Sequence, residues 1–344
     1  MVEIYATLGP ACAKQETLEQ MFQAGLTGMR LNLSHTGLRE SEELVACFKK
    51  AAEDAHVVPQ LLIDMQGPEL RVGRLEQTLE LQEGEQVVLG RKALGRKALG
   101  RGVLIPVPEA VMPVMEAGDE VLLNDGKIAL QILANKGTYA EAVVKRGGML
   151  SSHKSIKITG KQVVLPVLTE HDISNLRLAA EYGVTGLMQP FVQSGEDLLQ
   201  VRKALEENQA GHVKILAKIE NKAAVANLQS ILQEADVIII ARGDLGNDME
   251  LWELPAVQKD IEQACRQAGK PFVVVTQMLA SMEEHPVPTR AEVSDIFNAV
   301  ADGAYGVMIT GESAVGKHPV EAVKYLANTA RSAEAWLLKK GYKR

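Results

Sequence analysis

The sequence has few features of exported, disulfide-bonded or nucleic-acid-binding proteins. Its three cysteines, Cys12, Cys47 and Cys265, are scattered and show neither a disulfide framework nor the paired spacing of a zinc site. No apolar run approaches the roughly 20 residues of a membrane-spanning helix, and the first residues do not form an export signal. The formal net charge of -7 argues against general attraction to nucleic acid or to an anionic membrane. We therefore expect a cytoplasmic protein. Its net charge does not exclude the binding of small anionic ligands.

The amino-acid composition is typical of an ordinary soluble enzyme. Hydrophobic residues make up 46% of the 344 residues and charged residues 24%, which allows a large buried core. The length exceeds one average domain, but it suits one β/α barrel of about 250 residues with a small insertion.

Short β-branched apolar runs alternate with amphipathic stretches along most of the chain. The apolar runs predict strands at residues 4–8, 29–33, 59–65, 186–192, 213–219, 237–241, 272–276 and 306–310. The amphipathic stretches predict helices at residues 15–24, 38–55, 171–182, 194–208, 223–234, 254–268, 290–301 and 319–338. A parallel sheet can close at eight strand–helix units, so we predict a (β/α)8 TIM barrel, with an open doubly wound sheet as the alternative.

The alternation is interrupted after the third predicted strand. Residues 71–165 contain short alternating stretches separated by glycines, which predicts a small β-rich insert between two barrel segments, 1–70 and 166–344. Within the insert, Gly-Arg-Lys-Ala-Leu occurs twice in tandem at residues 90–99. We interpret this basic repeat as a solvated loop, because no aromatic side chains accompany it to stack on bases.

Polar residues gather where the predicted strands end. In a parallel barrel the catalytic groups come from the C-terminal strand ends, and residues two apart on a strand point to the same side. A single Lys-x-Glu pair is usually a local ion pair, but five converging strand ends favour an active site. The side chains concerned are Arg30, Asn32, Ser34, Asp64, Lys218, Glu220, Asp244 and Thr276.

The chemistry of these side chains is typical of metal-assisted phosphoryl transfer. Glu220 and Asp244 offer the oxygen ligands that Mg²⁺ or Mn²⁺ prefers, while leaving positions for a substrate. Lys218 and Arg30 would face the transferring group, where catalysis consists mainly of positioning and charge stabilisation. Gly243 would let backbone N–H groups approach a substrate carboxylate, with Thr276 nearby.

Two other motifs are not assigned to the site. Residues 311–318 resemble a phosphate-binding loop, but His318 stands where a Ser or Thr would hold Mg²⁺. His35 has the chemistry of a general acid or base, but we interpret it as a packed histidine at a strand end.

Taken together, these segments resemble the pyruvate kinase family over nearly the whole chain. The segments at 6–11, 29–35 and 64–71 are similar to the opening segments of the family. Four later stretches follow the family pattern almost letter for letter, at residues 217–221, 241–246, 276–282 and 288–292. The resemblance implies transfer of the phosphoryl group of phosphoenolpyruvate to ADP, giving ATP, followed by protonation of enolpyruvate to pyruvate.

The resemblance also implies roles for individual residues. The divalent ion would be held by Glu220 and Asp244, and the transferring phosphoryl group would contact Lys218 and Arg30. Thr276 would lie near the enolate.

Further ligands are implied in the same way. The backbone of Gly243 and Asp244 would hold the substrate carboxylate, and Glu69 implies dependence on K⁺. The K⁺ ligands would be Asn32, Ser34, Asp64 and the carbonyl of Met65. The insert would correspond to a mobile lid, with nucleotide-binding residues Arg71, Asp125 and Lys154.

Some segments depart from the family pattern. Met65-Gln66 stands where Thr-Lys is usual, and residues 190–193 read Pro-Phe-Val-Gln where Ser-Phe-Val-Arg is usual. The resemblance therefore does not predict the nucleotide affinity or the turnover rate. The chain stops after the last predicted barrel helix, so we expect neither the C-terminal effector domain of the family nor activation by sugar phosphates. The remaining contact of the family, between barrels, predicts a homodimer.

Two other functions remain as alternatives. A divalent-metal lyase or decarboxylase could make the same pyruvate enolate without a nucleotide, although it would not need Lys218, Arg30 or the K⁺ ligands. A non-catalytic binding protein descended from the family would bind the metal and phosphoenolpyruvate without turnover.

Overall fold

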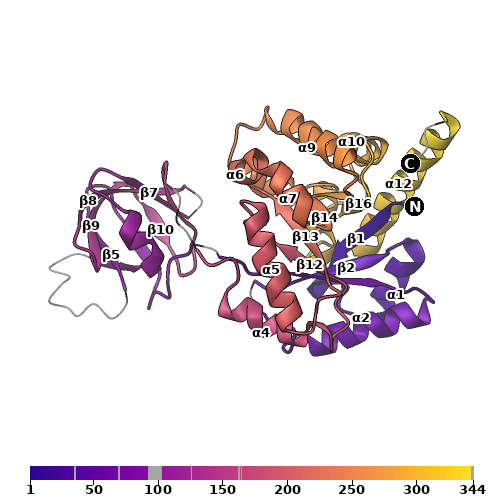
Figure 1. The fold of residues 1–344 in the computed structure, drawn as a ribbon, viewed down its shortest axis with the longest axis horizontal. Helices are drawn as coiled ribbons and strands as arrows, with labels where there is room; N and C mark the ends of the chain where they lie inside the picture. Colours follow the sequence, from indigo (N-terminus) through magenta and orange to yellow (C-terminus); the bar gives the residue numbers. More distant parts are fainter. Residues whose placement is uncertain are drawn as a thin grey trace. The chain divides into compact units, whose positions relative to one another are not determined.

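The computed structural model describes residues 1–34, 36–68, 70–91, 103–124, 126–161, 163 and 165–341. The chain divides into two compact units (Figure 1). One consists of Met1–Gly67 and Val167–Arg344, and the other is Pro68–Pro166. His35, Glu69, Asp125 and most of the basic repeat lie outside the described residues.

The first unit is a closed barrel of eight parallel strands, which confirms the predicted fold class. Its strands are β1 (Glu3–Thr7), β2 (Gly28–Asn32), β3 (Gln60–Asp64), β12 (Gly186–Gln189), β13 (Lys214–Ile219), β14 (Val237–Ala241), β15 (Phe272–Val275) and β16 (Gly306–Met308). β3 pairs with β12 on the far side of the insert in sequence, and β1 closes the barrel on β16.

Helices surround the strands (Figure 1), and the longer helices bury apolar residues in the barrel core. They are α1 (Gln15–Ala24), α2 (Glu42–Asp54), α4 (Glu170–Ala179), α5 (Gly195–Glu207), α6 (Lys222–Ala226), α7 (Leu228–Glu234), α8 (Arg242–Asn247), α9 (Leu254–Ala268), α10 (Arg290–Ala301), α11 (Gly311–Ala314) and α12 (Pro319–Lys339), with 3-10 turns η1 (Pro10–Cys12) and η3 (Ala280–Glu283). Among the described helices, none combines the length and the apolar character needed to cross a membrane.

Several elements differ from the predicted ranges, and three of the differences have a clear physical cause. The helix expected at 223–234 is two helices, because Asn227 ends α6 and its side chain donates to the carbonyl of Gln193 at 2.8 Å. β12 stops at Gln189, since the next residue is a proline without an N–H to continue the ladder. β15 stops at Val275, because Thr276 adopts a positive φ of 75°.

The inward faces of the strands change from apolar to charged along the barrel. Side chains two apart on a strand share a face, so Asp64 follows Leu62 inward and Lys218 follows Leu216 inward. The leucines belong to a buried cluster of Tyr5, Leu62, Met188, Leu216, Val237, Ile239, Ala241, Val273, Val275 and Met308. This cluster fills the interior beneath the strand ends.

One buried carboxylate holds the chain on both sides of the insert. Asp172, in the first turn of α4, accepts hydrogen bonds from the backbone N–H groups of Gln66 at 2.9 Å and Gly67 at 3.2 Å. It also accepts from the N–H and the hydroxyl of Thr169, both at 2.8 Å. The last residues before the insert and the first helix after it are thereby tied together within the barrel unit.

The second unit is β-rich, in agreement with the predicted insert after β3. A six-stranded sheet has the order β11 (Ile156–Ile158), β7 (Glu120–Leu123), β8 (Ile128–Asn135), β9 (Tyr139–Arg146), β5 (Gln86–Gly90), β6 (Val103–Pro106). A second sheet pairs β4 (Leu79–Leu81) with β10 (Gly148–Leu150), and a 3-10 turn, η2, spans Glu109–Val114. Alternate residues of these strands form a separate apolar core.

Candidate active site

Lys218 lies at the centre of a buried group of charges at the strand ends. Its ammonium nitrogen is 3.1 Å from Glu220 Oε2 and 3.6 Å from Asp64 Oδ1. The inward position of Lys218 above Leu216 directs its side chain over the barrel interior, and Glu220 continues the same face just after β13 ends. Two strands that are distant in sequence therefore place an ammonium between two carboxylates.

Arg30 adds a second cation from β2. Its guanidinium Nε donates to Asp64 Oδ2 at 2.8 Å, and NH2 lies 2.6 Å from the same oxygen. Its NH1 donates to the hydroxyl of Thr7 at 3.2 Å. Asp64 consequently carries Arg30 on one oxygen and Lys218 near the other.

Burial and neighbouring charges together raise the pKa values of both Lys218 and Glu220 above their ordinary values. Burial alone would lower the pKa of Lys218, but the carboxylates of Asp64 and Glu220 outweigh it and hold the pKa above its ordinary value. Burial raises the pKa of the Glu220 carboxyl; Lys218 opposes this effect and the charge of Asp244 adds to it. Asp244 is thus close enough to act on both Lys218 and Glu220.

Two carboxylate oxygens in this group fit the binding of cations. Asp64 Oδ1 and Glu220 Oε2 are buried and accept no hydrogen bond from any described residue. The ammonium of Lys218 lies near both oxygens. A metal ion would add the direct ligand contact that these buried oxygens lack. Within the described ranges, no three His, Cys, Asp or Glu side chains gather to hold a metal ion on their own. Glu220, with the charge of Asp244 acting on it, has the chemistry of a partial ligand set that substrate and water would complete.

The residues expected to bind K⁺ lie at the adjoining ends of β2 and β3. Asn32 pairs with Asp64 in the strand register, so both side chains are on the same face. The Oδ1 of Asn32 accepts from the N–H of Ser34 at 3.1 Å, which fixes the turn after β2. Met65 is buried, and its N–H donates to the carbonyl of Met188 at 3.1 Å. The arrangement provides hard oxygen atoms, which a monovalent cation prefers.

The turn after β15 brings Thr276 against the first turn of α8, which follows β14. A Cβ on Gly243 would lie 2.7 Å from Thr276 Cγ2, so only glycine allows this approach. Gly243 and Asp244 belong to the first turn of α8, which follows β14 directly. The predicted carboxylate-binding backbone and Thr276 are therefore in contact.

The residues predicted to bind the nucleotide lie in the second unit. Arg71 forms an isolated antiparallel bridge with Ser155, and its guanidinium NH1 donates to the carbonyl of His153 at 2.8 Å. The N–H of Val72 donates to the carbonyl of Lys154 at 2.8 Å. Arg71 and Lys154 are thus held on neighbouring segments of that unit.

Three groups at the site have no role in the sequence prediction. Thr7 receives the hydrogen bond from Arg30, and its inward position two residues after Tyr5 would have identified it. The N–H of Phe191 donates to Glu220 Oε1 at 2.6 Å, with Phe191 at a φ of 55°, which sequence patterns do not reveal. The third is the guanidinium of Arg242, which contacts the turn after β15.

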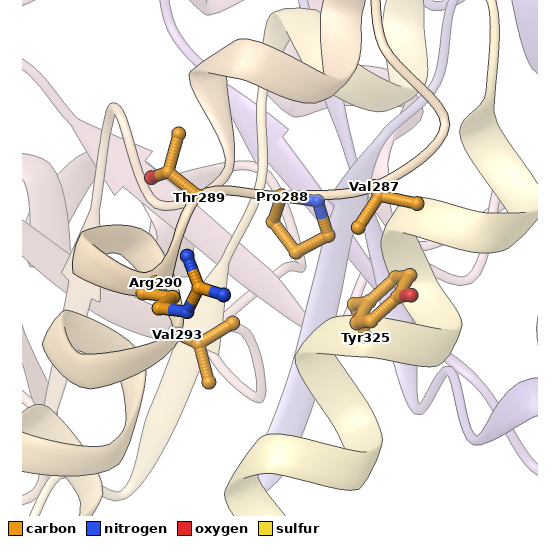
Figure 2. Close-up of a pocket in the computed structure, with 6 residues that line it drawn as sticks. All are labelled: Val287, Pro288, Thr289, Arg290, Val293 and Tyr325. Atoms are coloured by element: carbon orange, nitrogen blue, oxygen red, sulfur yellow. The ribbon is translucent and has the colours of Figure 1, made fainter.

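A separate hollow on the barrel contains none of these residues. Figure 2 shows it between the segment before α10, the first turn of α10 and α12, and its volume is about 280 Å³. Its wall consists of Val287, Pro288, Thr289, Arg290, Val293 and Tyr325. Because this wall carries one cation and no cluster of ionisable groups, it does not fit the chemistry at the strand ends.

Comparison with known proteins gives one consistent result. The family description "Pyruvate kinase, barrel domain" matches residues 1–323. Pyruvate kinase of Geobacillus stearothermophilus is 37% identical over 335 residues, which are 96% of this chain and 57% of that protein. Pyruvate kinase of Chlamydia trachomatis serovar D is 38% identical over 333 residues, 96% of this chain and 68% of that protein. Pyruvate kinase of Thermococcus litoralis is 37% identical over 344 residues, 99% of this chain and 71% of that protein. The chain thus spans little more than half of the length of the first of these relatives.

Proposed function

The chain belongs to the pyruvate kinase family, and on that premise we propose that it transfers the phosphoryl group of phosphoenolpyruvate to ADP. The bond between phosphorus and the enol oxygen breaks, and a bond to an oxygen of the terminal ADP phosphate forms. The enolate that remains takes a proton at its methylene carbon, so the products are ATP and pyruvate.

The observation that supports this proposal most strongly is the buried ammonium of Lys218 between Glu220 and Asp64. Together with Arg30 it supplies two preorganised cations at a site largely removed from water. Such charges stabilise a transferring phosphoryl group far better than they would in solvent. Asp64 Oδ1 and Glu220 Oε2, the oxygens nearest the ammonium of Lys218, accept no hydrogen bond from the described residues, which supports their use as ligands of a cation.

The proposal includes two kinds of cation. Glu220 and Asp244 would hold Mg²⁺ or Mn²⁺, which when bound would neutralise charge on the phosphoryl and enolate oxygens. Asn32, Ser34, Asp64 and the carbonyl of Met65 would hold K⁺.

The remaining residues would bind and enclose the substrates. The backbone of Gly243 and Asp244 would bind the carboxylate, and Thr276 would lie near the enolate. The insert, bounded in the proposal by residues 71–165, would act as a lid that excludes water and contributes Arg71, Asp125 and Lys154 to the nucleotide.

A coupled assay for pyruvate tests the reaction and its cations together. Phosphoenolpyruvate, ADP and Mg²⁺ are supplied to the purified chain in parallel buffers of K⁺ and Na⁺. We expect pyruvate only when ADP is present, and faster formation in K⁺. Pyruvate formed without ADP would favour a lyase, and binding of Mg²⁺ and phosphoenolpyruvate without pyruvate would favour a non-catalytic protein.

Assembly and location are part of the same proposal. A homodimer formed through the barrel follows from the family resemblance, and light scattering that detects only monomer would refute it. A cytoplasmic location follows from the scattered cysteines and would be tested by cell fractionation.

A further inference from the structure

We infer that Arg242 is a positioning residue that holds the turn after β15 in the conformation that presents Thr276 to the substrate. The inference rests on the proposed function, because that function assigns Thr276 to the enolate. The role differs from that of Lys218 and Arg30, since Arg242 acts through another residue.

The turn has a backbone conformation that its own residues do not favour. Thr276 has a φ of 75° and Gln277 a φ of 55°, so two consecutive non-glycine residues are left-handed. For a β-branched residue such as threonine this region is a genuine outlier. A conformation of this kind persists only where the surrounding structure determines it.

The guanidinium of Arg242 holds one side of the turn in this conformation through hydrogen bonds to its backbone. Its NH2 donates to the carbonyl of Thr276 at 2.7 Å and contacts the sulfur of Met278 at 2.9 Å. Its Nε donates to the carbonyl of Val275 at 3.3 Å. The rigid guanidinium of one side chain therefore donates to the carbonyls on both sides of the Thr276 α-carbon.

Two acidic residues on other helices hold Arg242 and the turn after β15 in place. Asp295 on α10 accepts from Arg242 NH1 at 2.6 Å, which sets the plane of the guanidinium. Glu312 on α11 is buried and accepts from the N–H of Leu279 at 3.0 Å. The turn is therefore held near Thr276 by Arg242 and at its downstream end by Glu312.

The position of Arg242 in the chain explains why this matters for the site. Its backbone begins α8 and is followed at once by Gly243, which packs against the methyl group of Thr276. Arg242 thus connects the first turn of α8, which would bind the substrate carboxylate, with the turn that carries Thr276. Loss of its side chain would let Thr276 move relative to Gly243, and a displacement of about 1 Å costs on the order of 100-fold in rate.

A kinetic double-mutant cycle tests this role. We expect Arg242→Gln and Thr276→Ala each to lower kcat on the order of 100-fold, with the KM for phosphoenolpyruvate changed by less than about threefold. The double variant should be no slower than Thr276→Ala alone, because Arg242 acts through Thr276. Arg242→Lys, which keeps a donor for one carbonyl, should recover part of the rate, and Asp295→Asn should lose less than Arg242→Gln.

Arg202 provides a matched control on α5. Its NH2 donates to Asp236 at 2.8 Å and to the carbonyl of Glu234 at 3.3 Å, so it also joins a carboxylate and a carbonyl. Arg202→Gln should reduce thermal stability to a similar degree as Arg242→Gln and leave kcat unchanged. A loss of kcat in both variants would mean that a general loss of stability explains the effect, and the inference would fail.

The failure of this inference can be separated from failure of the proposed function. Losses that multiply in the double variant, with an active parent protein, would overturn the positioning role alone. An inactive parent protein would refute the proposed function, and a crystal structure of Arg242→Gln would then decide the role of the arginine. Thr276 still at a φ near 75° would overturn it, and Thr276 in an ordinary region would support it.

Discussion

Two layers of the barrel interior lie on the same faces of the same strands and carry opposite kinds of side chain. Leu62 and Leu216 belong to the closed apolar cluster, whereas Asp64 and Lys218, two residues further along β3 and β13, are charged. The apolar layer stabilises the fold by removing surface from water. The charged layer bears a desolvation cost and contains two carboxylate oxygens that accept no hydrogen bond from the described residues. On each of these strands, the residue that stabilises the fold and the residue proposed to bind ligand are therefore only two positions apart.

Among the substitutions considered, Lys218→Met in the charged layer should have the largest effect on activity. We expect kcat to fall on the order of 10³-fold, which is about 4 kcal/mol of transition-state stabilisation, because the ammonium facing the phosphoryl group is lost. Binding of Mn²⁺, measured by isothermal titration calorimetry, should persist. Turnover within about tenfold of the parent would contradict the assignment.

Replacement of Leu216 by Ala tests the layer below. Truncating this buried side chain should lower the free energy of unfolding by about 2–5 kcal/mol, measured by urea denaturation, because a cavity is left in the interior. Leu338→Ala is the control, since Leu338 is exposed and should change stability by less than about 0.5 kcal/mol. Equal effects of the two substitutions would show that the interior cluster does not stabilise the barrel as we argue.

Replacement of Glu220 by Gln sharpens the comparison within the charged layer. Affinity for Mn²⁺ should fall at least as much as for loss of an outer-shell partner, about 10- to 100-fold, because one of two carboxylate ligands becomes an amide. Glu262→Gln is a matched control, because Glu262 is also buried and also lies beside a lysine, Lys259, but belongs to α9 and not to the candidate site. A similar loss of affinity in both variants would indicate a nonspecific charge effect.

Glu292 gives the smallest expected effect and contrasts with Glu220. Burial would raise its pKa, but hydrogen bonds from Ser281 and Thr289 outweigh burial and hold the pKa below its ordinary value. An acid with a lowered folded pKa stabilises the protein above its unfolded pKa, near 4.3, and loses that contribution as the pH falls through the folded value.

The measurement is the urea midpoint of the parent and of Glu292→Gln between neutral pH and pH 3. The variant should be less stable by about 1 kcal/mol at neutral pH, since Glu292 caps α10 and holds η3. The difference should vanish as the acid is protonated. A difference that is constant with pH would show that the charge of Glu292 has no part in it.

Much of the barrel could be predicted because its signals are local. The strand that carries Lys218 and the one that ends at Asp64 are evident from apolar runs, which also place both residues at strand ends. The split of the helix at Asn227 and the early end of β15 at Thr276 were not evident. Each depends on contacts with residues far away in the chain, which local propensity does not contain.

Within the site, the kinds of side chain could be predicted, but their pairing could not. Arg30 was expected to face the substrate, and the structure also joins it to Asp64 and Thr7. The backbone N–H of Phe191 as a partner of Glu220 could not be foreseen, because it requires a positive φ at a non-glycine residue.

The sequence by itself determined the alternation of strands and helices, the insert after the third strand and the charged residues at strand ends. Periodicity and residue chemistry are sufficient for these, because each is expressed within a few neighbouring positions. Only the tertiary structure decided which charges meet and what holds Thr276 in its turn. The reason is physical: closing the barrel brings together β2, β3 and β13, and Arg242 reaches a strained peptide 34 residues later in the chain.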